Sequence, residues 1–126
     1  MTSNKIEINA PNKVFRSFID IEEFLSVLVC CLLDKNEESY MLFDATGGEI
    51  VEVRELAELV KFYLFKNASI QSELINSEDE DHYYGDPKKY NSLIKKYGIE
   101  SKSLKYQIFN TYKFLNSQTK LVEDPL

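Results

Sequence analysis

The sequence predicts a mixed α/β fold, with one small domain of about four helices and several short strands. Two observations favour this fold class. Stretches with apolar residues at helical spacing alternate along the chain with short β-prone runs. The 126 residues, with 44% hydrophobic and 13% aromatic content, suffice for a single core, so we expect one domain over residues 1–126. Residues 117–126 should form a flexible tail.

The rest of the chain is expected to pack around residues 15–33, where a short extended segment leads into a strongly apolar helix. Asp20 is suited to cap this helix, and Glu23, three residues later, completes a capping-box pattern. The helix should therefore begin near Ile21. Because Ser26 is the one polar residue in its apolar run, most sides of the helix should be covered by other parts of the protein.

Short extended stretches are expected on both sides of this helix, at residues 5–10, 14–19, 40–43, 50–51 and 69–75. The run YMLF at 40–43 should be a buried strand, closed by a tight turn at Thr46-Gly47-Gly48 whose glycines permit positive φ. The acidic stretch 77–81 is interpreted as a solvated loop. A cation site is the alternative there, but no glycine-shaped ligand loop frames it.

Three further helices are expected downstream. The second has apolar residues at helical spacing from Val53 to Leu64. The third should start at Asp86-Pro87, with a capping aspartate and proline at the first helical position, and end at Gly98. The fourth should begin at Ser103 and place four apolar residues on one face, namely Leu104, Ile108, Tyr112 and Leu115.

Composition narrows the function classes. A formal net charge of −6 argues against nucleic acid or an anionic membrane as partner, because phosphate binding needs a clustered positive surface. The lysines between positions 88 and 105 are interpreted as a solvated face, with a phosphate track as the less favoured alternative. The apolar run is too short to cross a bilayer and the N-terminus has no signal core, so we expect a soluble cytoplasmic protein.

No catalytic or metal site is complete in the sequence. Cys30 and Cys31 are adjacent on a helix, so buried reduced thiols are favoured over a disulfide or shared metal. His82 is the single histidine, which gives a zinc site almost no support. Tyr84 and Lys88 have Tyr-x-x-x-Lys spacing, but the intervening glycine and proline prevent one helix from holding both, so this match is interpreted as chance.

The order of several motifs is informative. The stretch 16–23, RSFIDIEE, is similar to Arg-Asp-Phe-Ile-His-Val-x-Asp, and residues 43–48 are similar to Tyr-Asn-x-Gly-x-Gly. Residues 55–59 are similar to a Leu-Ala-Glu helix. Further along the chain, residues 86–89 match Asp-x-x-Lys and residues 97–99 match a Leu-Gly-Trp ending. In this order, over residues 8–116, the pattern resembles the C-terminal, substrate-binding domain of the NAD-dependent epimerase/dehydratase family, the extended short-chain dehydrogenases that act on sugar nucleotides.

The resemblance implies a role in substrate recognition. In the family an arginine at the position of Arg16 contacts the ribose or diphosphate of the sugar nucleotide, and guanidinium geometry suits that role. The alternative is that Arg16 pairs with Asp20 or Glu23. A second family arginine is absent, since the matching neighbourhood here is residues 74–77. Ser17, Asp20 and Asp44 are further departures from the pattern, where the family has Asp, His and Asn.

The resemblance also implies what lies outside this chain. Family members carry the NAD or NADP fingerprint and the catalytic Tyr-x-x-x-Lys pair in a preceding Rossmann domain. We therefore expect a C-terminal fragment of an epimerase, dehydratase or reductase that contains no catalytic or cofactor-binding residue and is inactive alone. Without the Rossmann domain, the apolar helix should cause self-association. The alternative is a non-catalytic protein interaction module derived from this domain, and a free-standing enzyme has little support.

Overall fold

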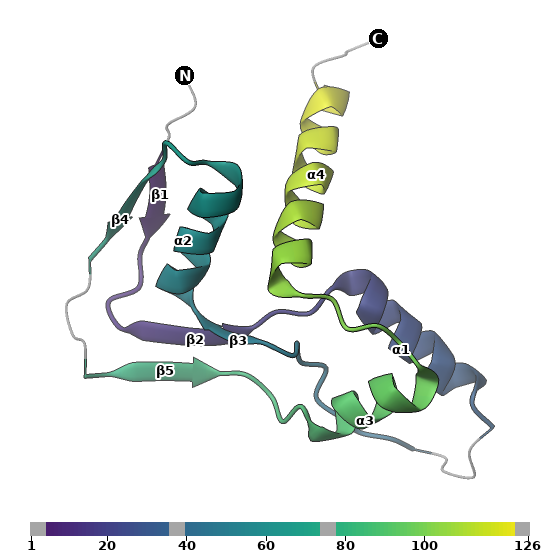
Figure 1. Cartoon of the computed structure of the whole chain (residues 1–126). Helices are drawn as coiled ribbons and strands as arrows, with labels where there is room; N and C mark the ends of the chain where they lie inside the picture. The colour runs from purple at the N-terminus through teal and green to yellow at the C-terminus, as the bar shows by residue number, and fades with distance from the viewer. Residues whose placement is uncertain (1–4, 36–39, 74–77, 123–126) are drawn as a thin grey trace.

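The computed structural model describes residues 5–35, 40–73 and 78–122, and in this part of the chain it contains four helices and five short strands (Figure 1). The helices are α1 (Ile21–Leu33), α2 (Val53–Leu64), α3 (Lys88–Tyr97) and α4 (Leu104–Val122). The strands are β1 (Lys5–Ile8), β2 (Lys13–Ser17), β3 (Ile50–Glu52), β4 (Ser69–Ser72) and β5 (Glu80–Tyr83). The expected small mixed α/β fold is confirmed.

The strands form two small sheets. In the three-stranded sheet, β2 lies between β3, to which it is antiparallel, and β5, to which it is parallel. The other sheet is a parallel pair of β1 and β4. Helix α2 contacts strands of both sheets, and α1 and α3 lie together on the opposite side of the molecule from the β1–β4 pair (Figure 1).

Arg54, on the first turn of α2, ties the two sheets together. Its guanidinium donates to the carbonyl oxygens of Ala10 at 2.8 Å and Asn12 at 3.1 Å, and its Nε donates to Ser72 Oγ at 2.7 Å. It also pairs with Glu52, whose other carboxylate oxygen accepts from the Arg54 backbone N–H and caps α2. Arg54 therefore satisfies backbone carbonyls in the β1–β2 connection and holds β4 beside them.

The core is divided into two clusters. One contains Val27, Tyr90 and Leu93, and joins α1 to α3. The other is built from Val51, Leu104 and Ile108, and the apolar face of α2 packs on it. Each cluster has three buried members, and partly buried apolar side chains from neighbouring elements pack around them.

The predicted cap of α1 is confirmed, but the capping box is only half formed. Asp20 accepts from the backbone N–H groups of Glu22 and Glu23. Glu23 does not reach back to the cap. Its side chain is buried and accepts from the Tyr90 hydroxyl at 3.1 Å and the Lys102 backbone N–H at 2.6 Å. Glu23 thus bonds to distant parts of the chain in place of the backbone at the cap. These bonds join α1 to α3 and to the segment between α3 and α4.

The expected burial of α1 on most sides is wrong for its outer face. Six apolar side chains there are between 38% and 76% exposed: Ile21, Leu25, Leu28, Val29, Leu32 and Leu33. Only the side that carries Val27 and Glu23 is buried. The domain has one helix, α3, to pack against α1, and that covers one side. Cys30 and Cys31 are half-buried free thiols on this helix, less enclosed than expected.

Residues 40–43 do not form the expected buried strand. Met41 and Phe43 pack against the α1–α3 core while Tyr40 and Leu42 are exposed, so the segment is extended chain, and no strand in the described part of the protein pairs with it. The Gly47 turn needs glycine for a different reason than the expected positive φ. A Cβ there would lie 1.6 Å from the Phe18 carbonyl oxygen.

Other boundaries differ less. Glu80 and Asp81, expected in a solvated acidic loop, belong to β5, which pairs with β2, and the side chains of Lys13 and Arg16 on β2 pair with them. Helix α3 begins at Lys88, one residue after the proline. Gly98 ends it in the left-handed conformation at φ 62°, as expected. Helix α4 continues to Val122, so much of the expected tail 117–126 is helical, while 123–126 lie outside the described residues.

We predict that alkaline pH destabilises this fold through Tyr90. Burial, followed by the charge of Glu23 and the hydrogen bond to it, raises the pKa of the Tyr90 hydroxyl above its ordinary value of about 10. The folded state then holds the proton more tightly than the unfolded chain, so the contribution is fully present below pH 10 and is lost as pH rises above it. Urea unfolding at a series of pH values should show this loss.

The variant Tyr90→Phe checks the assignment. At pH 7 it should lower the free energy of unfolding by about 1.5–3 kcal/mol, because the buried Glu23 carboxylate loses a hydrogen bond. It should also lose less stability above pH 10 than the wild type. Some dependence will remain, since burial and the bond to Asp34 raise the pKa of Tyr97 too. Tyr40→Phe, at a 73% exposed position, is the control and should change neither quantity.

Candidate functional site

Arg16, the predicted ligand contact, lies on β2, the central strand of the three-stranded sheet. Its register partners are Val51 on β3 and Tyr83 on β5. Because β2 and β5 run parallel, side chains of Arg16, Asp81 and Tyr83 share one face of the sheet. The sheet therefore presents a cation, a carboxylate and an aromatic ring together on that face.

The guanidinium of Arg16 is held in place by this neighbourhood. Nη2 pairs with Asp81 Oδ2 at 2.8 Å, and Nη1 donates to the carbonyl oxygen of Phe15 at 2.9 Å and to that of Asp81 at 3.4 Å. The expected alternative partners, Asp20 and Glu23, are both engaged elsewhere. A structural ion pair exists, but with a carboxylate that the sequence analysis did not select.

These contacts leave part of the guanidinium free for a ligand. An arginine carries five N–H groups, and here Nη1 donates to two carbonyl oxygens and Nη2 to one carboxylate oxygen. Among the described residues, none accepts from the Nε–H or from the second Nη2–H, and the side chain is 30% exposed. The carbon of the guanidinium lies 5.3 Å from the centre of the Tyr83 ring, which is itself 76% exposed. The Arg16 guanidinium and the Tyr83 ring therefore form one surface that combines a cation with an aromatic ring.

The other face of the same strands carries a polar chain centred on His82. The imidazole stacks on Phe15 with ring centres 4.7 Å apart and planes 4° apart. Its Nε2 is 2.9 Å from Glu80 Oε2, and its Nδ1 is 3.3 Å from the Tyr84 hydroxyl. Lys13 also pairs with Glu80, at 3.3 Å. Hydrogen bonds from His82 and then from Lys13 lower the pKa of the Glu80 carboxyl below its ordinary 4.5.

A polar hollow of about 450 Å³ opens at the end of β5. It is lined by seven residues, namely Phe43, Asp44, Ala45, His82, Tyr83, Tyr84 and Gly85. Gly85 is required there, because a Cβ at that position would lie 2.5 Å from the Cβ of Asp44. Asp44 in turn accepts from the Asp86 backbone N–H at 3.0 Å. Tyr83 belongs both to this hollow and to the Arg16 surface.

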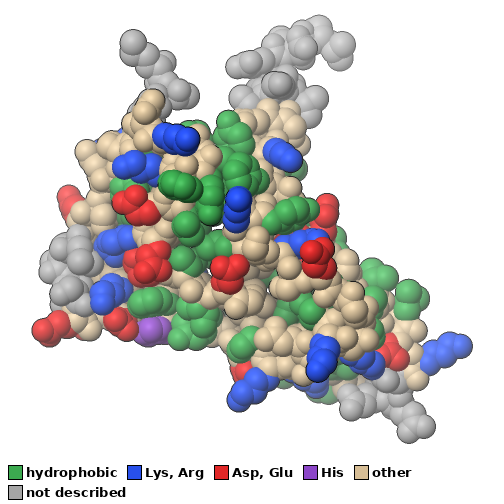
Figure 2. All heavy atoms as spheres, in the orientation of Figure 1, with side chains coloured by type: hydrophobic (Ala, Val, Ile, Leu, Met, Phe, Trp, Pro, Cys, Tyr) green, Lys and Arg blue, Asp and Glu red, His purple; other side chains and the backbone are tan. Residues whose placement is uncertain are grey.

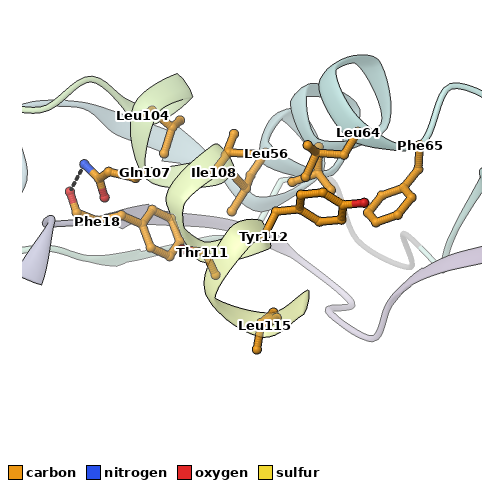
Figure 3. A pocket seen from close by; sticks show the side chains of 11 residues that line it. Phe18, Leu56, Leu64, Phe65, Leu104, Gln107, Ile108, Thr111, Tyr112 and Leu115 are labelled. Carbon is orange, nitrogen blue, oxygen red and sulfur yellow. Dashed lines mark hydrogen bonds between the residues drawn. The ribbon is translucent and has the colours of Figure 1, made fainter. Parts of the chain in front are cut away.

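A second hollow, between α2 and α4, is apolar. It has a volume of about 350 Å³, and Figure 3 shows Leu56, Leu64, Ile108 and Tyr112 pointing into it, with Phe18 at one end. Apolar side chains gather along the same boundary between the two helices on the surface in Figure 2. Because its polar lining groups are uncharged and come from Gln107, Thr111 and the Tyr112 hydroxyl, this groove is unsuited to a polyhydroxylated, charged ligand.

Two motifs considered in the sequence concern catalysis and metal binding. Tyr84 precedes α3 and Lys88 begins it, so the two do not share a helix, as expected. Within the described residues, no cluster of three or more His, Cys, Asp or Glu side chains could hold a metal ion.

The neighbourhood of the missing second arginine, 74–77, lies outside the described residues. None of the helices in the described part of the chain has the length and apolar character to cross a membrane.

Sequence reasoning missed Asp81, Tyr83 and His82 as neighbours of the site. The available signal was the period-two pattern from 80 to 84, in which Glu80, His82 and Tyr84 alternate with Asp81 and Tyr83. The acidic residues at the start of this segment favoured a loop over a strand. The positive charges that pair with them lie on β2, and the sequence alone does not give the register between β2 and β5.

Comparison with protein-family models, with curated proteins and with solved structures finds no match for this chain.

We predict that the low pKa of the Glu80 carboxyl depends on His82. In an NMR titration that follows the side-chain carboxyl carbon, Glu80 should titrate below 4.5 in the wild type, and His82→Ala should move its midpoint upward, because the strongest hydrogen bond to the carboxylate is lost. Tyr84→Phe removes the contact on the far side of the ring and should leave the Glu80 midpoint in place. An unmoved midpoint in His82→Ala would show that the β5 side chains are not arranged this way.

Proposed function

We propose that this chain is the sugar-nucleotide-recognition domain of an NAD-dependent epimerase/dehydratase and is not catalytic alone. The observation that supports this most is the arrangement at Arg16. A guanidinium is oriented by Asp81 and the Phe15 carbonyl, lies over an exposed tyrosine ring and retains two unused N–H donors. Two donors on adjacent guanidinium nitrogens match two oxygens of one phosphate or carboxylate.

The ligand contact follows from this arrangement. A diphosphate oxygen pair would accept from Nε and Nη2 of Arg16, and the ribose or base would lie against the exposed ring of Tyr83. Asp81 orients the guanidinium and also reduces the net positive charge of the site. Because charge alone then attracts an anion less strongly, the site favours an anionic ligand that also makes stacking and hydroxyl contacts. Sugar nucleotides supply all of these. Free inorganic phosphate supplies only the charge and should bind far more weakly.

A second function is favoured by a different observation. The outer face of α1 is a continuous set of exposed apolar side chains, which is more typical of a protein interaction surface than of a free domain surface. The alternative is therefore a non-catalytic interaction module. Sugar-nucleotide binding separates the two: the recognition domain requires it, and the interaction module does not.

We predict that Arg16→Ala weakens sugar-nucleotide binding about 10- to 100-fold, since a lost charge-assisted hydrogen bond costs on the order of 1.5–3 kcal/mol. NMR titration of the labelled chain with UDP-glucose and GDP-mannose measures this directly. Arg16→Lys should recover only part of the affinity, because a point charge cannot reproduce two fixed donors. In the complete enzyme, the same substitutions should raise the Michaelis constant and leave cofactor binding nearly unchanged.

A matched control lies on the same strand. Lys13→Ala also removes one positive charge from β2, but from the opposite face of the sheet, and should leave the titration unchanged. Thermal unfolding of each variant completes the test. If Arg16→Ala sharply lowers the melting temperature while the ligand titration stays the same, Arg16 is a structural partner of Asp81 and the site assignment is wrong.

We also predict that the chain as given neither binds NAD nor turns over a sugar nucleotide. Its four glycines do not form a dinucleotide fingerprint, and its one Tyr-x-x-x-Lys match is not on a single helix. Calorimetry with NAD should show no heat of binding in the micromolar range. Measurable micromolar affinity would contradict the proposal that cofactor binding belongs to another domain.

A further inference from the structure

The outer face of α1 consists of Ile21, Leu25, Leu28, Val29, Leu32 and Leu33, which are between 38% and 76% exposed. The polar exceptions on the solvent side of the helix are Glu22 and Ser26, and the Ser26 hydroxyl is already bonded to the helix backbone. No described segment of the chain covers this face. We propose that a second copy of this chain covers it, through an antiparallel contact of α1 with α1.

The spacing along α1 is self-complementary. Ile21, Leu25, Leu28 and Leu32 follow one another at intervals of four, three and four residues, which places them in one stripe along the helix. The interval pattern reads the same in both directions. In an antiparallel pair with two-fold symmetry, Ile21 of one copy therefore lies level with Leu32 of the other, and Leu25 with Leu28. All four layers are apolar.

The two ends of α1 differ in a way that suits antiparallel pairing. Leu32 and Leu33, at the C-terminal end, are each 76% exposed. At the N-terminal end lies a hollow of about 410 Å³, bordered by Ile21 and Glu22 of α1 and by Phe114 of α4. Antiparallel pairing brings the two leucines of each copy to the hollow of the other. Phe114 is 62% exposed and would be covered by the same contact.

Charge favours the antiparallel over the parallel arrangement. Helix α1 contains no lysine or arginine, and Glu22 is its exposed charge. In a parallel pair the two Glu22 carboxylates would be adjacent at one end. In the antiparallel pair Glu22 lies level with Cys31 of the other copy, about 13 Å along the axis from the second Glu22, at a rise of 1.5 Å per residue. That separation exceeds the screening length of about 8 Å at physiological salt.

The short length of α1 limits the strength of the contact between two copies. A helix of 13 residues is about 20 Å long. One helix pair with Phe114 at each end falls in the smaller class of specific interfaces, which is typical of weak and reversible assemblies. We therefore expect dissociation in the micromolar range, not an obligate dimer.

Analytical ultracentrifugation over a concentration series tests the dimer with matched variants. Leu32→Glu should raise the dissociation constant at least tenfold, because it places a charge in the paired stripe. Leu42→Glu is the control: the same substitution at a 73% exposed leucine outside the contact should leave the constant unchanged. Both positions are exposed, so folding is retained. A wild type that stays monomeric up to about 500 μM overturns the proposal, and so does an equal effect of the two variants.

Mixing variants tests the register. Ile21→Lys alone should also weaken the dimer. An equimolar mixture of Ile21→Lys with Leu32→Glu should recover association, because antiparallel pairing places the new lysine level with the new glutamate in one layer and keeps the native layer at the other end. A parallel pair would bring neither layer together. Recovery supports the antiparallel contact, and a mixture no stronger than either variant alone contradicts it.

Discussion

The buried carboxylate of Glu23 is the contact on which the arrangement of the helices depends. A charge removed from water needs close partners, and Glu23 finds them in the Tyr90 hydroxyl and the Lys102 backbone N–H. These partners belong to α3 and to the connection that precedes α4. One side chain thereby sets where both later helices lie relative to α1. Because α1 follows β2 closely in the chain, the contact that holds α1 also helps to hold the strand that carries Arg16.

The sequence was a good guide to elements whose signals are local. The cap at Asp20, the start of α2 after β3 and the glycine that ends α3 were all predicted, because each depends on residues within one helical turn. The failures depended on distant partners. The run 40–43 has strand composition but finds no partner strand in the described chain, and the acidic residues of β5 become a strand only beside Lys13 and Arg16.

The candidate site shows the same division. Arg16 was found from its place in a motif order, and the structure puts it on the central strand with an exposed guanidinium edge. Its two immediate neighbours, Asp81 and Tyr83, were missed because they are more than sixty residues away in the chain. A local pattern can nominate a binding arginine. It cannot say which carboxylate orients it, and that carboxylate decides how many donors are left for a ligand.

The two parallel strand pairs have a consequence for how this chain folds. Lys5 pairs with Ser69 and Lys13 with Glu80, so neither sheet can close until more than sixty further residues have been synthesised. Contacts of such long sequence separation make folding slow, and during synthesis α1 emerges well before either partner strand. The nascent chain therefore carries its most apolar helix before α3, the helix that packs on it, has been made.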